Sequence, residues 1–165
     1  MKKLKIKKVF ITKQGEHSQN FQEFFKIAKE KNISIYQVKA GDKIIIEENC
    51  CFKVLFPTDE LIQQNVLNNN SMVAKFTYYN FTALFTGDIE EIAEKQIIEM
   101  YKNTNELKVN LLKVAHHGSK TSSTQEILNV IKPQIAFIGV GKDNKFGHPN
   151  KDVIERFQNL RCKSL

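Results

Sequence analysis

Residues 109–120 read VNLLKVAHHGSK, an almost continuous apolar run that ends in a polar cluster. A run of this kind is expected of a β-strand that is covered on both faces of its sheet. Two similar boundaries occur elsewhere: Phe81–Phe85 is followed by Thr86-Gly87-Asp88, and Gln134–Val140 is followed by a segment that reaches His148. The sequence therefore predicts three strands with polar residues at their carboxyl ends.

Strand and helix patterns alternate through the remainder of the chain. We expect further strands at Leu4–Ile11, Ile33–Val38, Lys43–Glu47, Phe52–Phe56 and Met72–Tyr79. Helices are expected at 18–31, 89–102, Thr124–Ile131 and Lys151–Leu160, and residues 58–70 are expected to form a loop. These elements predict an α/β fold with a mixed sheet and helices packed against it. Such folds bind ligands in the loops at the carboxyl ends of their strands.

The composition is that of an ordinary globular protein. Of the 165 residues, 41% are hydrophobic and 26% are charged, which excludes a disordered or low-complexity chain. No apolar run approaches the roughly 20 residues of a membrane helix. No apolar segment follows the basic start of the chain to form a secretory signal. We therefore expect a cytoplasmic location, and reduced thiols at the three cysteines.

One aspartate and three histidines follow the predicted strands: Asp88, His116, His117 and His148. Because the carboxyl ends of parallel strands meet at one edge of a sheet, we expect these side chains to lie close together. Imidazole and carboxylate groups suit Zn²⁺, Mn²⁺ or Fe²⁺, and a pair of such ions can activate water for hydrolysis. The residues indicate a divalent-metal site at this edge.

Each of these residues also has a purely structural interpretation. Asp88 is a fitting N-cap for the helix that follows it. The two adjacent histidines could form a polar turn, and His148 before Pro149 could open the last helix. Ser119 is a candidate helix cap. Three successive strand ends that carry Asp or His favour a shared site, although no single residue decides the matter.

The motifs resemble a known family. They are Asn70-Ser71, Phe85-Thr86-Gly87-Asp88-Ile89-Glu90, the segment 112–122 and Asn144-Lys145-Phe146-Gly147-His148-Pro149. Together they are similar to the metallo-β-lactamase-fold domain of the ComEC/Rec2 competence proteins and to soluble clostridial relatives. The resemblance covers nearly the whole chain, most clearly residues 68–160. It implies an αββα sandwich with one or two divalent metals, Zn or Mn, and hydrolysis of phosphodiester bonds in DNA linked to DNA uptake.

The resemblance also implies roles for individual residues. It implies that Asp88, His116 and His148 are metal ligands and that His117 and Ser119 are catalytic residues. Substrate binding falls on Gly118, Lys120 and Asn144. The motif does not decide which of the two adjacent histidines faces the metal, and we favour His116 because it directly ends the predicted strand.

The chain departs from the family in lacking the His-x-His-x-Asp-His motif, since its only earlier histidine is His17. We therefore expect residues 1–165 to be a single partial domain, the C-terminal portion of the fold, truncated at both ends. With so few ligands, the chain alone should bind metal weakly and have little or no catalytic activity. The partners that this implies are DNA and a separate chain carrying the N-terminal half of the fold.

Two alternatives remain open. Five lysines within residues 2–8, in a chain of net charge +7, permit a non-catalytic module that binds nucleic acid. The other alternative is a non-functional gene fragment. Salt-sensitive DNA binding that survives substitution of Asp88 and His116 would identify the binding module.

Overall fold

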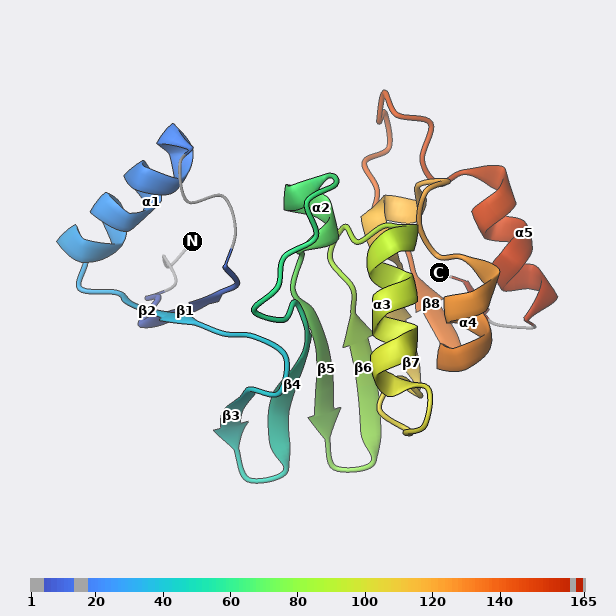
Figure 1. The fold of residues 1–165 in the computed structure, drawn as a ribbon, viewed down its shortest axis with the longest axis horizontal. Helices are drawn as coiled ribbons and strands as arrows, with labels where there is room; N and C mark the ends of the chain where they lie inside the picture. Colours follow the sequence, from blue (N-terminus) through green and yellow to red (C-terminus); the bar gives the residue numbers. More distant parts are fainter. Residues whose placement is uncertain (1–4, 14–17, 161–162, 165) are drawn as a thin grey trace.

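The computed structural model describes residues 5–13, 18–160 and 163–164, which form two β-sheets and their helices (Figure 1). The small sheet pairs β1 with β2 in parallel, and helix α1 connects the two strands. The elements are β1 (Lys8–Ile11), α1 (Gln19–Glu30), β2 (Ser34–Gln37), β3 (Lys43–Glu47), β4 (Cys50–Phe56), α2 (Val66–Asn69), β5 (Val73–Tyr78), β6 (Phe81–Phe85), α3 (Glu91–Tyr101), β7 (Leu111–Lys113), the 3₁₀ helix η1 (Ala115–Gly118), α4 (Gln125–Ile131), β8 (Ile135–Phe137), α5 (Lys151–Asn159) and β9 (Lys163–Ser164).

The large sheet is mixed, as the sequence predicts. Its strand order is β3-β4-β5-β6-β7-β8-β9. Strands β3 to β6 pair antiparallel, whereas β6 to β9 pair in parallel. The carboxyl ends of β6, β7 and β8 therefore lie at one edge of the sheet, which is the upper edge in Figure 1.

The core lies between one face of this sheet and helices α3, α4 and α5. Leu84, Leu112 and Ala136 are register partners on β6, β7 and β8, so they share this face, and all three are buried. The helices contribute buried apolar side chains to the same cluster, among them Ala93, Ile97, Ile127, Leu128, Val153 and Phe157. This packing fixes the spacing of the three strands and hence of the loops that follow them.

The opposite face of the sheet, called here the open face, carries Phe85, Lys113 and Phe137 as register partners. Phe85 and Phe137 remain 41% and 49% exposed. Alternate residues of a strand point to opposite faces of its sheet, so these side chains cannot reach the helices. The described residues thus leave an apolar surface uncovered directly behind the strand ends.

The first described residues form the β1–α1–β2 unit. Ser18 caps α1 by accepting a hydrogen bond from the backbone N–H of Phe21, and Ala28 is buried beneath the helix, as the periodicity predicts. Lys5, Lys7 and Lys8 are exposed. The predictions that concern Leu4, His17, Cys162 and the first lysines lie outside the described residues.

The structure differs from the sequence prediction at several places. Strand β1 begins at Lys8 instead of Leu4, and β8 covers Ile135–Phe137 instead of Gln134–Val140. Residues 58–70, expected to be a loop, include the short helix α2. Strand β7 has three residues instead of the longer run 109–115, because the backbone turns into η1 at Ala115. The apolar residues Val114 and Ala115 are buried there although they lie outside the strand. A prediction based on apolar character alone therefore placed the end of the strand too late.

Two further predictions can be compared with the structure. Cys50 and Cys51 are free cysteines, as expected. Among the described residues, no helix has the length and apolar character needed to cross a bilayer.

A buried carboxylate fixes the start of α4 against α3. Glu94 on α3 is 1% exposed and accepts hydrogen bonds from the backbone N–H groups of Ser123 (2.5 Å) and Thr124 (2.9 Å). Burial raises the pKa of Glu94, while the hydrogen bonds from Thr124 and Ser123 lower it. The carboxylate satisfies donors that the first turn of a helix leaves unpaired.

We expect Glu94→Ala to lower the free energy of unfolding by about 2–4 kcal/mol, because the backbone N–H groups of Ser123 and Thr124, one buried and one partly buried, lose their acceptor. Glu94→Gln, which keeps one acceptor oxygen, should cost less. The exposed Glu99 on the same helix is the matched control, and Glu99→Ala should change stability by at most about 0.5 kcal/mol. Urea denaturation of the three variants measures this, and equal effects of Glu94→Ala and Glu99→Ala would contradict it.

Candidate functional site at the strand ends

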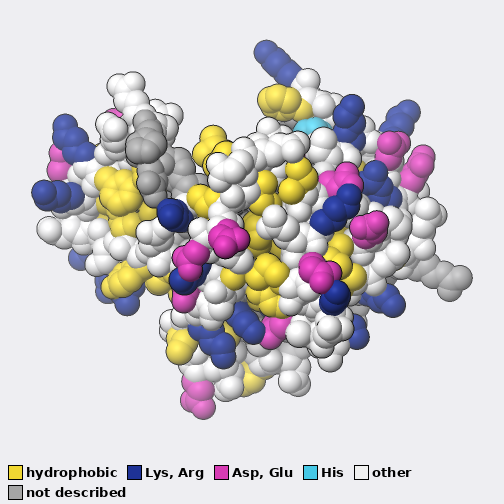
Figure 2. Space-filling view, viewed as in Figure 1, with side chains coloured by type: hydrophobic (Ala, Val, Ile, Leu, Met, Phe, Trp, Pro, Cys, Tyr) yellow, Lys and Arg dark blue, Asp and Glu magenta, His cyan; other side chains and the backbone are white. Residues whose placement is uncertain are grey.

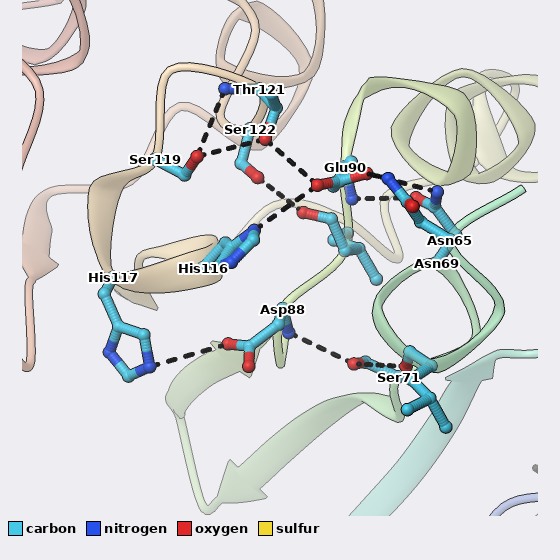
Figure 3. Close-up of polar contacts among 12 residues, drawn as sticks. Asn65, Asn69, Ser71, Asp88, Glu90, His116, His117, Ser119, Thr121 and Ser122 are labelled. Atoms are coloured by element: carbon cyan, nitrogen blue, oxygen red, sulfur yellow. Dashed lines mark hydrogen bonds and ion pairs between the residues drawn. The ribbon is translucent and has the colours of Figure 1, made fainter. Parts of the chain in front are cut away.

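The ends of β6, β7 and β8 bring the predicted site residues to one edge of the sheet. Asp88 follows β6, His116 and His117 lie in η1 after β7, and His148 follows β8. Nε2 of His117 is 3.8 Å from Oδ1 of Asp88, and the rings of His116 and His148 meet edge to face with centroids 5.9 Å apart. Figure 3 shows His117 pointing toward Asp88 while His116 points away from it.

The ring of His117 is oriented by a backbone carbonyl. Its Nδ1 lies 2.5 Å from the carbonyl oxygen of Gly139. Because a carbonyl oxygen can only accept a hydrogen bond, Nδ1 carries the proton and the lone pair of the neutral ring is on Nε2. A second hydrogen bond that fixes the tautomer in this way is common for histidines that bind metals. Nε2, the nitrogen that carries the lone pair when the ring is neutral, therefore faces the Asp88 carboxylate.

The two histidines adopt a strained backbone. His116 and His117 have φ values of 45° and 55°, and Gly118 follows with φ 79°. The left-handed region costs a residue with a side chain roughly 1–2 kcal/mol. Hydrogen bonds hold the turn, from His116 N to Gly87 O (3.0 Å) and from Ser119 N to His116 O (2.9 Å). Strain that the surrounding structure enforces is typical of functional sites.

The Gly87-Asp88 loop is held from two sides. The backbone N–H of Asp88 donates to Oγ of Ser71 (3.2 Å), and a Cβ on Gly87 would stand 2.5 Å from Cβ of Ser71. Nζ of Lys113 donates to Gly87 O (3.3 Å) and lies 4.0 Å from Oδ1 of Asp88. Burial lowers the pKa of Lys113, and the nearby Asp88 carboxylate opposes that shift.

The interpretation of Asp88 as a helix cap is wrong. Helix α3 begins at Glu91, and its N-cap is Glu90, which makes no side-chain capping bond. The Asp88 side chain remains 42% exposed. A carboxylate that caps no helix and remains accessible is available to a ligand.

Glu90 is a residue of this region that the sequence analysis did not select. Its Oε1 accepts from Oγ1 of Thr121 (3.2 Å) and lies 3.6 Å from Nδ1 of His116, while its Oε2 accepts from Nδ2 of Asn65 (2.7 Å). Nδ1 of His116 is buried and makes no hydrogen bond. His116 thus faces Glu90 instead of Asp88. The spacing Asp88-Ile89-Glu90 was visible in the sequence, but an acidic residue at the start of a helix is ordinary.

The loop after β8 is organised by Asn144. Its side chain donates from Nδ2 to His148 O (2.8 Å) and accepts at Oδ1 from His148 N (3.0 Å). Burial, followed by the electrostatic influence of the neighbouring His116 and His117 imidazoles, lowers the pKa of His148. An open cavity of about 340 Å³ lies between this loop and His117. The sequence analysis expects Asn144 to bind substrate, but in the structure its side chain uses these hydrogen bonds to hold the loop.

The other predicted site residues serve the turn itself. A Cβ on Gly118 would lie 2.8 Å from Cβ of Pro149, so only glycine fits this contact. Ser119 is 6% exposed and pairs with Oγ1 of Thr121 (3.0 Å), and Figure 3 shows it on the far side of η1 from Asp88. Lys120 is exposed. The structure does not bring Ser119 to the Asp88–His117 pair.

The described residues do not contain a complete metal site. Among them, no group of three or more His, Cys, Asp or Glu side chains is placed to hold a metal ion. Asp88 and His117 are two converging donors, whereas catalytic metals commonly have three protein ligands. A divalent ion fits the chemistry of this pair, and a site with three protein ligands would need one more donor.

Comparisons with known proteins identify relatives of this chain. No family model matches it. Over 165 residues, all of this chain, it is 31% identical to ComE operon protein 3 of Bacillus subtilis, of which it covers 20%. It is 32% identical over 98 residues to Competence protein ComA of Neisseria gonorrhoeae, covering 59% of this chain and 14% of that protein. The chain thus spans a fifth or less of the length of these relatives.

The fold has a counterpart among solved structures. A proposed metal-dependent hydrolase from Parabacteroides distasonis superposes with a TM-score of 0.55 at 11% identity, over 97% of this chain and 76% of that one. The mixed sheet and its helices define a partial α/β fold of the metallo-β-lactamase type. Within that class the chain is a ComEC-like domain, related to the competence proteins of bacteria.

We expect Gly118→Ala to destabilise the protein more than Gly147→Ala. Both glycines have positive φ values, 79° and 69°, so both variants incur the conformational penalty of roughly 1–2 kcal/mol. Only Gly118 also faces a close neighbour, because nothing lies within 4 Å of a Cβ on Gly147. Thermal unfolding of the two variants measures the difference, and equal losses would show that the Pro149 contact is unimportant.

Proposed function

We propose that this chain supplies one side of the divalent-metal site of a ComEC-like metallo-β-lactamase domain, with Asp88 and His117 as metal ligands. We propose further that the completed site hydrolyses phosphodiester bonds of DNA in connection with DNA uptake. The observation that carries the proposal is the 3.8 Å approach of His117 Nε2 to Asp88 Oδ1, with the opposite ring nitrogen held by Gly139 O.

The chemistry of this pair supports metal binding. A neutral imidazole and a carboxylate are common ligands of Zn²⁺, and both groups are about half exposed, so an ion can reach them. A divalent metal bound there would supply Lewis-acid activation of water and of a phosphoryl oxygen. The protein's own contribution is orientation: the strained η1 turn and the Gly139 carbonyl hold His117 in one position. His148 remains a candidate for a further ligand or a substrate contact.

The choice between the adjacent histidines now favours His117. The end of the predicted strand pointed to His116, but the ring of His116 faces Glu90, with Nδ1 buried. We propose that His116 is a positioning residue, which links the η1 turn to Glu90 and thereby to Thr121 and Asn65. His117, with its lone pair toward Asp88, takes the metal.

The link to DNA uptake is supported by the relatives and by charge. One relative is named a competence protein, and the other is the product of the ComE operon. The net charge of +7 favours a polyanionic substrate. Phosphodiester hydrolysis in DNA is therefore the reaction that agrees best both with the relatives and with Asp88 and His117 as proposed metal ligands.

The remaining ligands would come from a segment outside these 165 residues. The open face ends beside the proposed site, since Phe85 and Phe137 are register partners of Lys113, whose ammonium group lies 4.0 Å from Oδ1 of Asp88. A segment that covers these exposed aromatic rings would be stabilised by burying them, and it would also reach Asp88 and His117. We propose that the open face binds the segment that carries the family's His-x-His-x-Asp-His motif.

The first test is metal-dependent stabilisation. Mn²⁺ or Zn²⁺ at about ten times its dissociation constant should stabilise the chain by about 1.4 kcal/mol, a rise of roughly 3–6 °C in the melting midpoint. Asp88→Asn and His117→Gln should lose this rise, and His116→Gln should retain most of it. Asp143→Asn, an exposed aspartate of the β8–α5 loop, is the matched control. A rise that persists in Asp88→Asn would refute the assignment.

The second test concerns completion of the site. A separately produced polypeptide with the His-x-His-x-Asp-His motif should tighten Mn²⁺ binding when mixed with the chain, as measured by isothermal titration. Phe137→Asp should abolish the gain, because it places a charge on the open face. Ile45→Asp, at an exposed residue of the edge strand β3, should leave the gain intact. Equal behaviour of the two variants would show that the open face is not the binding surface.

A further inference from the structure

The loop between β8 and α5 presents an aromatic ring to solvent beside the candidate site. Phe146 is 81% exposed, the most exposed of the large hydrophobic residues in the described part of the chain. The side chain of Asn144 holds this loop through hydrogen bonds to the backbone of His148, so the loop does not need the phenyl ring as an anchor. In Figure 2, hydrophobic, basic and histidine side chains gather at the top of the molecule, where Figure 1 draws this loop.

The ring is connected to the site by a series of contacts. Phe146 lies nearly parallel to the ring of His148, with an angle of 18° between the planes and centroids 6.0 Å apart. His148 in turn meets the edge of His116. The cavity of about 340 Å³ has both Phe146 and His117 in its wall. A ligand that occupies this cavity would therefore contact Phe146 and His117 together.

The charges on the loop favour a polyanion. Lys142 and Lys145 are exposed on either side of Asp143 and Asn144. An exposed aromatic ring with lysines beside it combines the two contacts that proteins use for single strands of nucleic acid. The ring stacks on a base, and the ammonium groups meet the phosphates.

We propose that Phe146 is a base-stacking contact for a single strand of nucleic acid, with Lys142 and Lys145 along its phosphates. This proposal rests on the proposed function, because it places the strand beside the Asp88–His117 pair. A base can stack on an added ring only when its face is free, so a single strand is favoured over a duplex. The stacked base would fix the position of the neighbouring phosphodiester in the cavity.

The chain offers a direct spectroscopic test because it has no tryptophan. Phe146→Trp places a single indole at the proposed contact, and an oligothymidylate of about 12 nucleotides should quench its fluorescence by stacking. Tyr79→Trp is the matched control: Tyr79 is 64% exposed at the β5–β6 turn, at the end of β6 opposite to Asp88. Quenching of Phe146→Trp alone supports the proposal. Equal quenching of both variants, or quenching of neither, overturns it.

Binding measurements complete the test. In fluorescence anisotropy, Phe146→Ala should weaken binding of the same oligothymidylate by about 5- to 100-fold, and Phe146→Tyr should restore most of the affinity. An unchanged melting midpoint of Phe146→Ala will establish that the fold is intact. An affinity unchanged in Phe146→Ala, or a duplex that binds the wild-type chain as tightly as the single strand, overturns the proposal. All measurements are made in EDTA, so that their outcome is independent of whether Asp88 and His117 bind metal.

Discussion

The backbone hydrogen bond from His116 N–H to Gly87 O, 3.0 Å long, joins the loop after β6 to the turn after β7. The rest of the site depends on it. It forms at the point where the chain leaves β7 and enters the left-handed residues His116 and His117. Nζ of Lys113 donates to the same carbonyl oxygen. Gly87 O therefore connects the Gly87-Asp88 loop both to strand β7, through Lys113, and to the η1 turn, through His116. Register between the parallel strands brings these groups opposite one another.

Two carboxylate–histidine pairs result from this geometry, and their surroundings differ. His117 and Asp88 are about half exposed, which leaves them accessible to a ligand. His116 and Glu90 are mostly buried, at 24% and 13% side-chain exposure, among hydrogen bonds to Thr121 and Asn65. A buried carboxylate is retained at low cost only where donors satisfy it. The buried pair is therefore suited to holding the turn, and the exposed pair to binding.

In our proposal, the open face and the small number of metal ligands have the same cause. A sheet with one face packed on helices and the other carrying exposed aromatic residues is half of a layered fold, because each apolar face must be covered for stability. Phe85, Lys113 and Phe137 lie in one row across that face. A segment that covers this row of residues would also desolvate Lys113 and change the electrostatic field at Asp88. Folding of the complete domain and assembly of its metal site are thus coupled in our proposal.

The sequence by itself determined the elements whose signals are local. Ser18 and Thr124 cap their helices because a side-chain oxygen before an amphipathic run satisfies the first N–H groups. The strand-end positions of Asp88, His116, His117 and His148 followed from apolar runs and the parallel order of strands. Only the tertiary structure decided which way each side chain points. The φ values of His116 and His117 are disfavoured locally, and the turn is held by residues distant in sequence: His116 N–H donates to Gly87 O, and Gly118 lies close against Pro149. For that reason the pairing of His117 with Asp88, and of His116 with Glu90, could not be read from the motif.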